Sequence, residues 1–200
     1  PVLTRSYQRV QWALGPAIPL VSSDAFLADC SQLARELGIL IHTHVLESPI
    51  QKRAYPQRYA GGLLQHLDRI GVLGAHWVLA HCVWLDQNDL ALVAKHQAKI
   101  VHNPGSNLRL GSGIADMRDM LRHGITVGVG TDGSTSSDNQ NMYEAMRLAA
   151  LVSRVKTEQV DQWISAEDAF YAATEGSAAC LGLKDQIGRL ESGFKADLVL

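Results

Sequence analysis

Four ionisable side chains each stand at or near the end of an apolar run of strand-like composition. They are His44, His81, His102 and Asp132. Imidazole nitrogens and a carboxylate are donors that Zn²⁺ and Fe²⁺ accept. A carboxylate buried beside an apolar strand is costly unless a cation lies nearby. Together, His44, His81 and Asp132 predict a site for a divalent metal with nitrogen and oxygen ligands.

A second carboxylate, Glu47, lies three residues after His44. On a helix this spacing would give an exposed pair on one face, whereas at the point where a strand gives way to a loop Glu47 would fold over His44. His42 has the same parity as His44 and shares its face of a strand, and we interpret it as a core histidine with satisfied hydrogen bonds. The remaining histidines are interpreted as structural: His66, His76, His96 and His123.

These side chains need elements that carry them to one place. Apolar runs predict strands over residues 10–14, 39–45, 77–83, 99–102 and 125–130. Amphipathic stretches predict helices from the cap at 22–24 to Gly38, and over 61–70, 86–96, 117–122, 141–155 and 166–181. A polar loop is expected after the second strand, and two short strands within 187–200.

Strands that are apolar throughout and separated by helices are typical of parallel βα units. Two α/β architectures satisfy this pattern: an open doubly wound sheet and a (β/α)₈ (TIM-like) barrel. An open sheet concentrates its chemistry at one switch point, whereas a barrel gathers it at the carboxyl ends of many strands. Because the polar residues follow four successive strands, the barrel is favoured.

Composition narrows the function classes further. The chain has 200 residues with 18 basic and 20 acidic side chains, a net charge of −2. That balance gives no sign of a nucleic-acid or membrane partner. The three cysteines are scattered and odd in number, so a disulfide framework is not expected and a reducing, cytoplasmic location is.

The ordered motifs resemble the amidohydrolase superfamily, in particular its branch of cytosine, guanine and S-adenosylhomocysteine deaminases and triazine hydrolases. The resemblance covers essentially the whole chain. It is carried by Gly15-Pro16, His42-Thr43-His44-Val45-Leu46-Glu47, Ala80-His81-Cys82, the stretch 102–111, Gly130-Thr131-Asp132-Gly133, and the segments 188–193 and 196–199.

The resemblance implies a metal-dependent hydrolytic deaminase of a nitrogen heterocycle such as a purine, pyrimidine or pterin. His44 and Asp132 would bind one divalent metal, zinc or alternatively iron, and Asp132 would also take the proton of the attacking water. Glu47 would pass a proton to the ring nitrogen, and His81 would stabilise charge on the attacking oxygen. Glu47 and His81 would also touch the substrate, together with Ser106 and Asn107. The partners would be the small heterocyclic substrate, water and further copies of the chain in a homo-oligomer.

Two departures from the family pattern matter. Ala17 follows Gly15-Pro16 where several of these deaminases carry a histidine, which leaves triazine-like substrates open. The family's first His-x-His pair is also missing, because His42-Thr43-His44 already occupies the strand-five position. We therefore expect barrel strands four to eight in residues 1–186, the return to a small β-domain in 187–200, and strands one to three in a preceding part of a larger enzyme.

Two alternatives to deamination remain. One is a triazine-type hydrolase that releases chloride or an alkylamine with the same metal site. The other is a non-catalytic fragment, since catalytic zinc normally keeps three protein ligands and the resemblance provides two.

Overall fold

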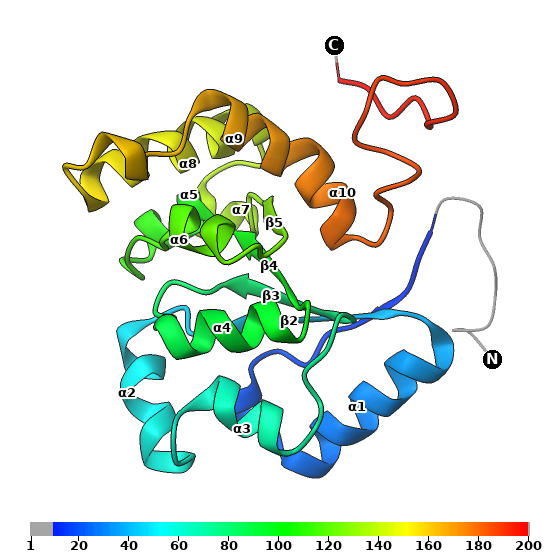
Figure 1. Cartoon of the computed structure of the whole chain (residues 1–200), viewed down its shortest axis with the longest axis vertical. Helices are drawn as coiled ribbons and strands as arrows, with labels where there is room; N and C mark the ends of the chain where they lie inside the picture. The colour runs from blue at the N-terminus through cyan, green and yellow to red at the C-terminus, as the bar shows by residue number, and fades with distance from the viewer. Residues whose placement is uncertain (1–9, 200) are drawn as a thin grey trace.

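A five-stranded parallel sheet forms the middle of the molecule (Figure 1), in the order β1-β2-β3-β4-β5. The computed structural model describes residues 10–199. The strands are β1 (Ala13–Leu14), β2 (Leu40–Val45), β3 (Trp77–His81), β4 (Lys99–His102) and β5 (Val127–Val129). A doubly wound sheet would reverse this order at a switch point. The unbroken order is that of a barrel wall, as the sequence predicted.

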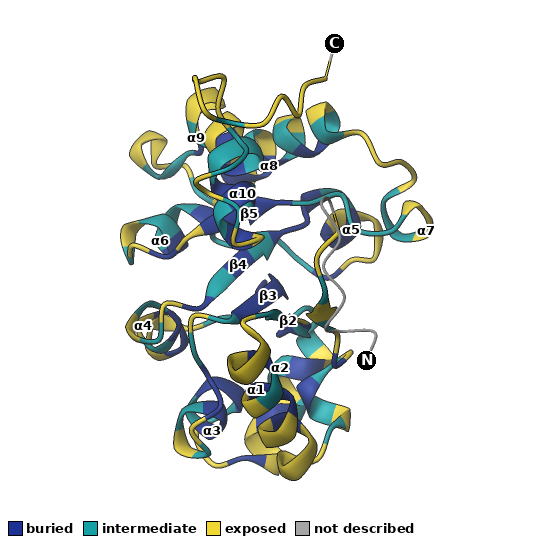
Figure 2. Ribbon diagram, turned by 90° about the vertical axis from the view of Figure 1, so that its right-hand side faces the viewer, coloured by how far each residue is buried: buried dark blue, intermediate teal, exposed yellow. Residues whose placement is uncertain are grey.

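The register places two rows of residues on opposite faces of the sheet. One row is fully buried against the helices and consists of Thr43, Leu79, Ile100 and Val127. The other row consists of His44, Ala80, Val101 and Gly128. The burial-coloured view in Figure 2 shows strands of buried and intermediate residues between the surrounding helices. The hydrophobic core therefore lies on the helix side, and the row that contains His44 faces the inside of the partial barrel.

Helix α1 (Asp24–Leu37) begins and ends at capping residues that are recognisable in the sequence. The side chain of Ser23 accepts a hydrogen bond from Phe26 N, and Gly38 closes the helix in the left-handed conformation at φ 62°. A hydroxyl cap satisfies a free amide at the start of a helix, and glycine takes positive φ without a steric penalty. Both boundaries agree with the prediction.

Four further helices match their predicted ranges within a few residues: α3 (Leu63–Arg69), α4 (Gln87–Lys95), α6 (Met117–Arg122) and α8 (Met142–Lys156). Short helical elements that the sequence did not predict are α5 (Pro104–Arg109), α7 (Ser134–Ser137), η1 (Pro19–Val21) and η2 (Val160–Gln162).

The prediction of a polar loop after the second strand is wrong, because residues of that stretch form helix α2 (Pro49–Arg58). The Ser48 side chain caps this helix by accepting from Gln51 N, and Pro49 stands in the first turn, where a missing N–H costs nothing. Pro56 inside the helix and the lack of an apolar stripe concealed it.

The predicted helix over 166–181 is continuous but contains a π-helical segment. It consists of α9 (Ala166–Tyr171), η3 (Ala172–Gly176) and α10 (Ser177–Cys180). A Cβ on Gly176 would lie 2.2 Å from Val127 O, so glycine is required for this approach. The Ser177 hydroxyl also accepts from Val129 N at 3.2 Å. This helix therefore covers the free edge of β5.

Two strand predictions need correction. The first strand is limited to Ala13–Leu14, and residues 187–199 form bends and turns instead of two strands. A strand requires a row of backbone bonds to a neighbouring strand, and within residues 10–199 this segment pairs with no strand of the sheet. Residues 1–9 and Leu200 of the two predicted domain ranges lie outside the described residues. Within residues 10–199, no helix combines the length and apolar character that crossing a membrane requires.

Candidate active site

The carboxyl ends of β2, β3 and β5 share an unusual backbone feature. Four non-glycine residues there have positive φ: Leu46 at 47°, His81 at 71°, Cys82 at 51° and Asp132 at 60°. Such residues are uncommon, and they tend to cluster where a structure holds functional groups in place. The left-handed backbone turns the chain away from the strand direction at these ends.

His44 is held by a backbone carbonyl. Its Nδ1 lies 2.6 Å from Ala17 O, and the same oxygen accepts from His44 N at 3.1 Å. A carbonyl oxygen can only accept, so Nδ1 carries the proton and the lone pair is on Nε2. This is the arrangement that metal-binding histidines normally adopt.

The ring of His81 stacks on the ring of His44, and its Nδ1 lies within hydrogen-bond distance of an asparagine oxygen. The two ring centroids are 5.4 Å apart at an interplanar angle of 19°. His81 is 1% exposed, and its Nδ1 lies 2.8 Å from Asn107 Oδ1. The predicted pair from two strand ends is therefore brought together.

Asp132 is half-buried and receives two hydroxyl donors on one oxygen. Ser106 Oγ donates to Oδ2 at 2.6 Å, and Ser136 Oγ at 3.0 Å. Burial alone would raise the pKa of Asp132, but the bonds from Ser106, the Gly133 backbone and Ser136, together with nearby His81, outweigh burial and lower the pKa. The carboxylate is thus stabilised in its ionised form.

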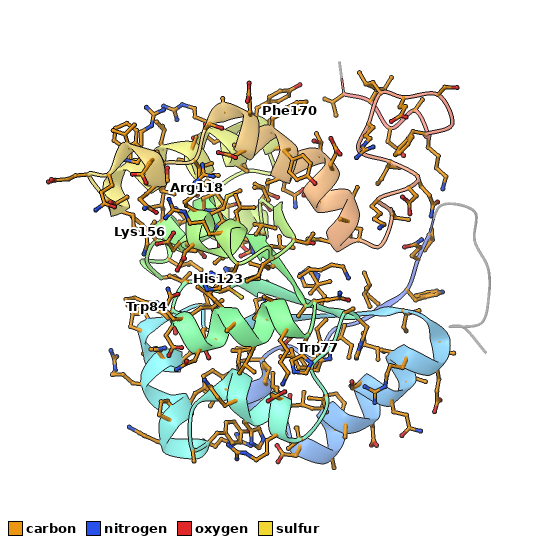
Figure 3. All side chains as sticks on the ribbon, in the orientation of Figure 1. Trp77, Trp84, Arg118, His123, Lys156 and Phe170 are labelled. Atoms are coloured by element: carbon orange, nitrogen blue, oxygen red, sulfur yellow. The ribbon has the colours of Figure 1, made fainter. Side chains whose placement is uncertain are left out.

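Glu47 lies between the end of β2 and the start of α2. Its N–H donates to Gln51 Oε1 at 3.0 Å, and its carboxylate accepts from Ser112 Oγ at 3.5 Å. Trp84, labelled in Figure 3, donates from Nε1 to Ser112 O at 2.8 Å. The half-buried carboxylate is therefore held beside a loop that an indole anchors.

His42 is not the core residue that the sequence predicted, because its side chain is exposed. It lies on the same face of β2 as His44. Although solvent reaches it, partial desolvation lowers its pKa, as do His44 and His81, while Asp132 acts in the opposite direction. Three predicted site residues are therefore within electrostatic reach of one ring.

His102 ends β4 and is 1% exposed. Neither ring nitrogen has a hydrogen-bond partner in the structure. Burial, with a smaller effect from His81, lowers its pKa to about 4. His102 is therefore neutral at physiological pH, as a packed side chain behind the site.

The candidate donors are of a kind that metals accept, but they are fewer than the three protein ligands that catalytic zinc normally keeps. His44 offers an imidazole nitrogen and Asp132 a carboxylate oxygen, each fixed by a hydrogen bond from its own surroundings. Among the described residues, no group of three or more His, Cys, Asp or Glu side chains is arranged to hold a metal ion. Two candidate donors for a metal, His44 and Asp132, thus lie in the described part of the chain.

Three contributors to the site were not predicted: the carbonyl of Ala17, and the hydroxyls of Ser112 and Ser136. A backbone carbonyl leaves no side-chain signal in a sequence. Ser136 lies in the serine-rich stretch that follows Asp132, which is the one local sign that a hydroxyl could return to the carboxylate.

Comparison with known proteins gives consistent results. The model of the Amidohydrolase family matches residues 3–200. A 5-methylthioadenosine/S-adenosylhomocysteine deaminase of Thermococcus onnurineus is 38% identical over 193 residues, 96% of this chain and 45% of the relative. The chain therefore spans less than half the length of this curated relative.

Two solved structures are similar to the chain as well. A zinc-bound adenosine deaminase from Xanthomonas campestris has a TM-score of 0.91 at 29% identity, covering 96% of this chain and 44% of that one. A zinc complex of atrazine chlorohydrolase from Arthrobacter aurescens has a TM-score of 0.88 at 34% identity, covering 94% and 41%. The fold is thus that of a partial TIM-like barrel, and a divalent metal is supported.

Proposed function

The chain belongs to the amidohydrolase family, and on that premise we propose that its site carries out metal-dependent hydrolytic deamination of a nitrogen heterocycle. The substrate class we propose is an adenine-type base or nucleoside, since a curated relative at 38% identity is named as a deaminase of such compounds. The family resemblance predicted from the sequence is thereby confirmed.

His44 and Asp132 are the residues that would hold the metal, which we propose to be zinc, with iron as the alternative. The support is the pair of fixed donors: Nε2 of His44 carries the lone pair because Nδ1 bonds Ala17 O, and Asp132 is oriented by Ser106. When bound, such a metal lowers the pKa of water from 15.7 to about 7 and provides hydroxide near neutrality.

The remaining steps fall to this chain's own side chains. Asp132, whose pKa is lowered, is ionised and can accept the proton of the attacking water. Glu47 would pass a proton to the ring nitrogen of the substrate. The Nε2 lone pair of neutral His81 would accept a hydrogen bond from the attacking water, whereas stabilising charge on the attacking oxygen would also require a proton on Nε2. General acid–base assistance of this kind typically contributes 10²–10⁴-fold in rate.

The observation that carries this proposal is the stacked pair of His44 and His81 at adjacent strand ends, with Nδ1 of each ring occupied by an acceptor. The test is ammonia release by the zinc-loaded chain from adenosine, 5-methylthioadenosine, S-adenosylhomocysteine and guanine. Release that disappears in Asp132→Asn supports the proposal. Turnover of none of these compounds by a folded, metal-loaded chain rejects it.

A second candidate is hydrolysis of a triazine ring with loss of chloride or an alkylamine. Its specific support is the likeness to the atrazine chlorohydrolase, together with Ala17 at the position where several of the deaminases carry a histidine. Turnover of chlorinated or alkylamino triazines, with no ammonia from the purine compounds, would favour this candidate over deamination.

The third alternative, a non-catalytic fragment, predicts less than one equivalent of tightly bound metal and no turnover on either panel. We also keep a cytoplasmic location and a homo-oligomer as proposals. Size-exclusion chromatography with light scattering tests the homo-oligomer, and a monomer at all concentrations would rule it out.

A further inference from the structure

Helix α5 connects two of the strand ends that carry the site. It follows β4, which lies between β3 and β5 in the sheet. Its neighbouring residues Ser106 and Asn107 are 0% and 1% exposed. Ser106 donates to Asp132 beyond β5, while Asn107 bonds His81 at the end of β3. Helix α5 therefore hydrogen-bonds one side chain at the end of each strand that flanks β4, namely Asp132 and His81.

The bond between Asn107 and His81 determines which ring nitrogen of His81 is protonated. The amide Oδ1 faces Nδ1 at 2.8 Å, and an amide oxygen can only accept. In neutral His81 the proton must then be on Nδ1, which leaves a lone pair on Nε2. With His44 stacked against the same ring, that nitrogen is the one available to a water or substrate.

We propose that Asn107 is a positioning residue that fixes the orientation and the Nδ1–H tautomer of His81. This goes beyond a substrate contact, because the amide oxygen is already engaged with His81. The inference uses the proposed function only for the role of His81, and its test requires neither metal nor turnover.

The amide nitrogen of Asn107 makes the test practicable. This buried Nδ2 has no hydrogen-bond partner in the structure. Replacement by leucine, which has a similar shape, removes an unsatisfied polar group together with the acceptor, so the fold is expected to survive. Asn107→Asp keeps an acceptor oxygen in place and serves as the rescuing variant, and Asn88→Ala, at an exposed asparagine of α4, is the control.

The measurement is long-range ¹H–¹⁵N NMR of the metal-free chain labelled at its 8 histidines, at about pH 8.5, where an ordinary histidine is neutral. His81→Gln identifies the signal. We expect the Nδ1–H pattern in the wild type, Asn107→Asp and Asn88→Ala, and loss of that preference in Asn107→Leu. Amide spectra of the variants report whether the fold is retained.

Two results would overturn the inference: an Nε2–H pattern for His81 in the wild type, or an unchanged Nδ1–H pattern in folded Asn107→Leu. If Asn107→Leu does not fold, the wild-type pattern and that of Asn107→Asp still decide the matter, because an Nε2–H ring in either contradicts an acceptor at Nδ1. An inactive chain with an Nδ1–H ring would remove the proposed function and leave this inference standing.

Discussion

Ser106 Oγ lies 2.6 Å from Asp132 Oδ2 and joins the helix after β4 to the end of β5. A hydrogen bond to an ionised group contributes more than a neutral one. Together with the second donor, Ser136, it holds the carboxylate in one orientation although the backbone at Asp132 is in the left-handed region. The geometry of the site therefore depends on residues outside the proposed reaction steps.

Removal of this hydroxyl should impair turnover more than folding. For Ser106→Ala we expect kcat/KM on the active substrate to fall about 10-fold or more, since a bond to a charged group contributes about 1.5–3 kcal/mol and 1.4 kcal/mol is tenfold. Steady-state kinetics measure it. The control is Ser137→Ala, whose hydroxyl bonds backbone carbonyls instead. Equal activity of Ser106→Ala and the wild type would contradict the role given to this bond.

Loss of the Glu47 proton should reduce the chemical step. For Glu47→Gln we expect kcat to fall by about 10²–10⁴-fold, with an unchanged melting temperature because the side chain is half-buried. Glu36→Gln, at an exposed position of α1, is the matched control and should keep full activity. A Glu47→Gln enzyme with wild-type kcat would show that another group supplies the proton.

His102 should make the fold sensitive to acid. Its folded-state pKa of about 4 lies below the ordinary 6.5, so between these values the unfolded chain binds a proton that the folded chain does not. Stability contributed by neutral His102 is therefore lost as the pH falls through that window. We expect urea midpoints to decline less steeply from pH 6.5 to 4 in His102→Leu than in the wild type. His123→Gln, which retains His102, is the control. Parallel pH profiles for His102→Leu and the wild type would refute this explanation.

A methyl group on Gly176 should destabilise the edge of the sheet. In Gly176→Ala the new Cβ would lie 2.2 Å from Val127 O, so the helix must shift, and overpacking of this kind costs about 1–3 kcal/mol. Thermal unfolding measures the loss. Gly15→Ala is the control, because nothing lies within 4 Å of a Cβ there. If both variants have the melting temperature of the wild type, the close approach of Gly176 to Val127 O is refuted.

The residues at the strand ends could be predicted from the sequence. Several of the groups that hydrogen-bond them could not. Apolar runs end where the polar residues begin, so His44, His81 and Asp132 could be assigned to strand ends from periodicity alone. The site also needs tertiary contacts that periodicity does not encode, such as the carbonyl of Ala17, which lies 27 residues before His44.

Helices without an apolar stripe were missed for a related reason. The polar stretch after β2 was expected to form a loop, yet a capping serine and tertiary burial of Tyr55 stabilise helix α2, which also contains Pro56. His42 was misassigned because parity gives the face of a strand but not what covers that face. Such coverage is decided by the rest of the fold.

Whether His44 and Asp132 bind the metal is measured most directly by zinc-edge anomalous diffraction from crystals of the chain grown with Zn²⁺. We expect an anomalous peak bonded to His44 Nε2 and to an Asp132 carboxylate oxygen, with His44 Nδ1 still on Ala17 O. A peak on other side chains, with none at these two atoms, would contradict it.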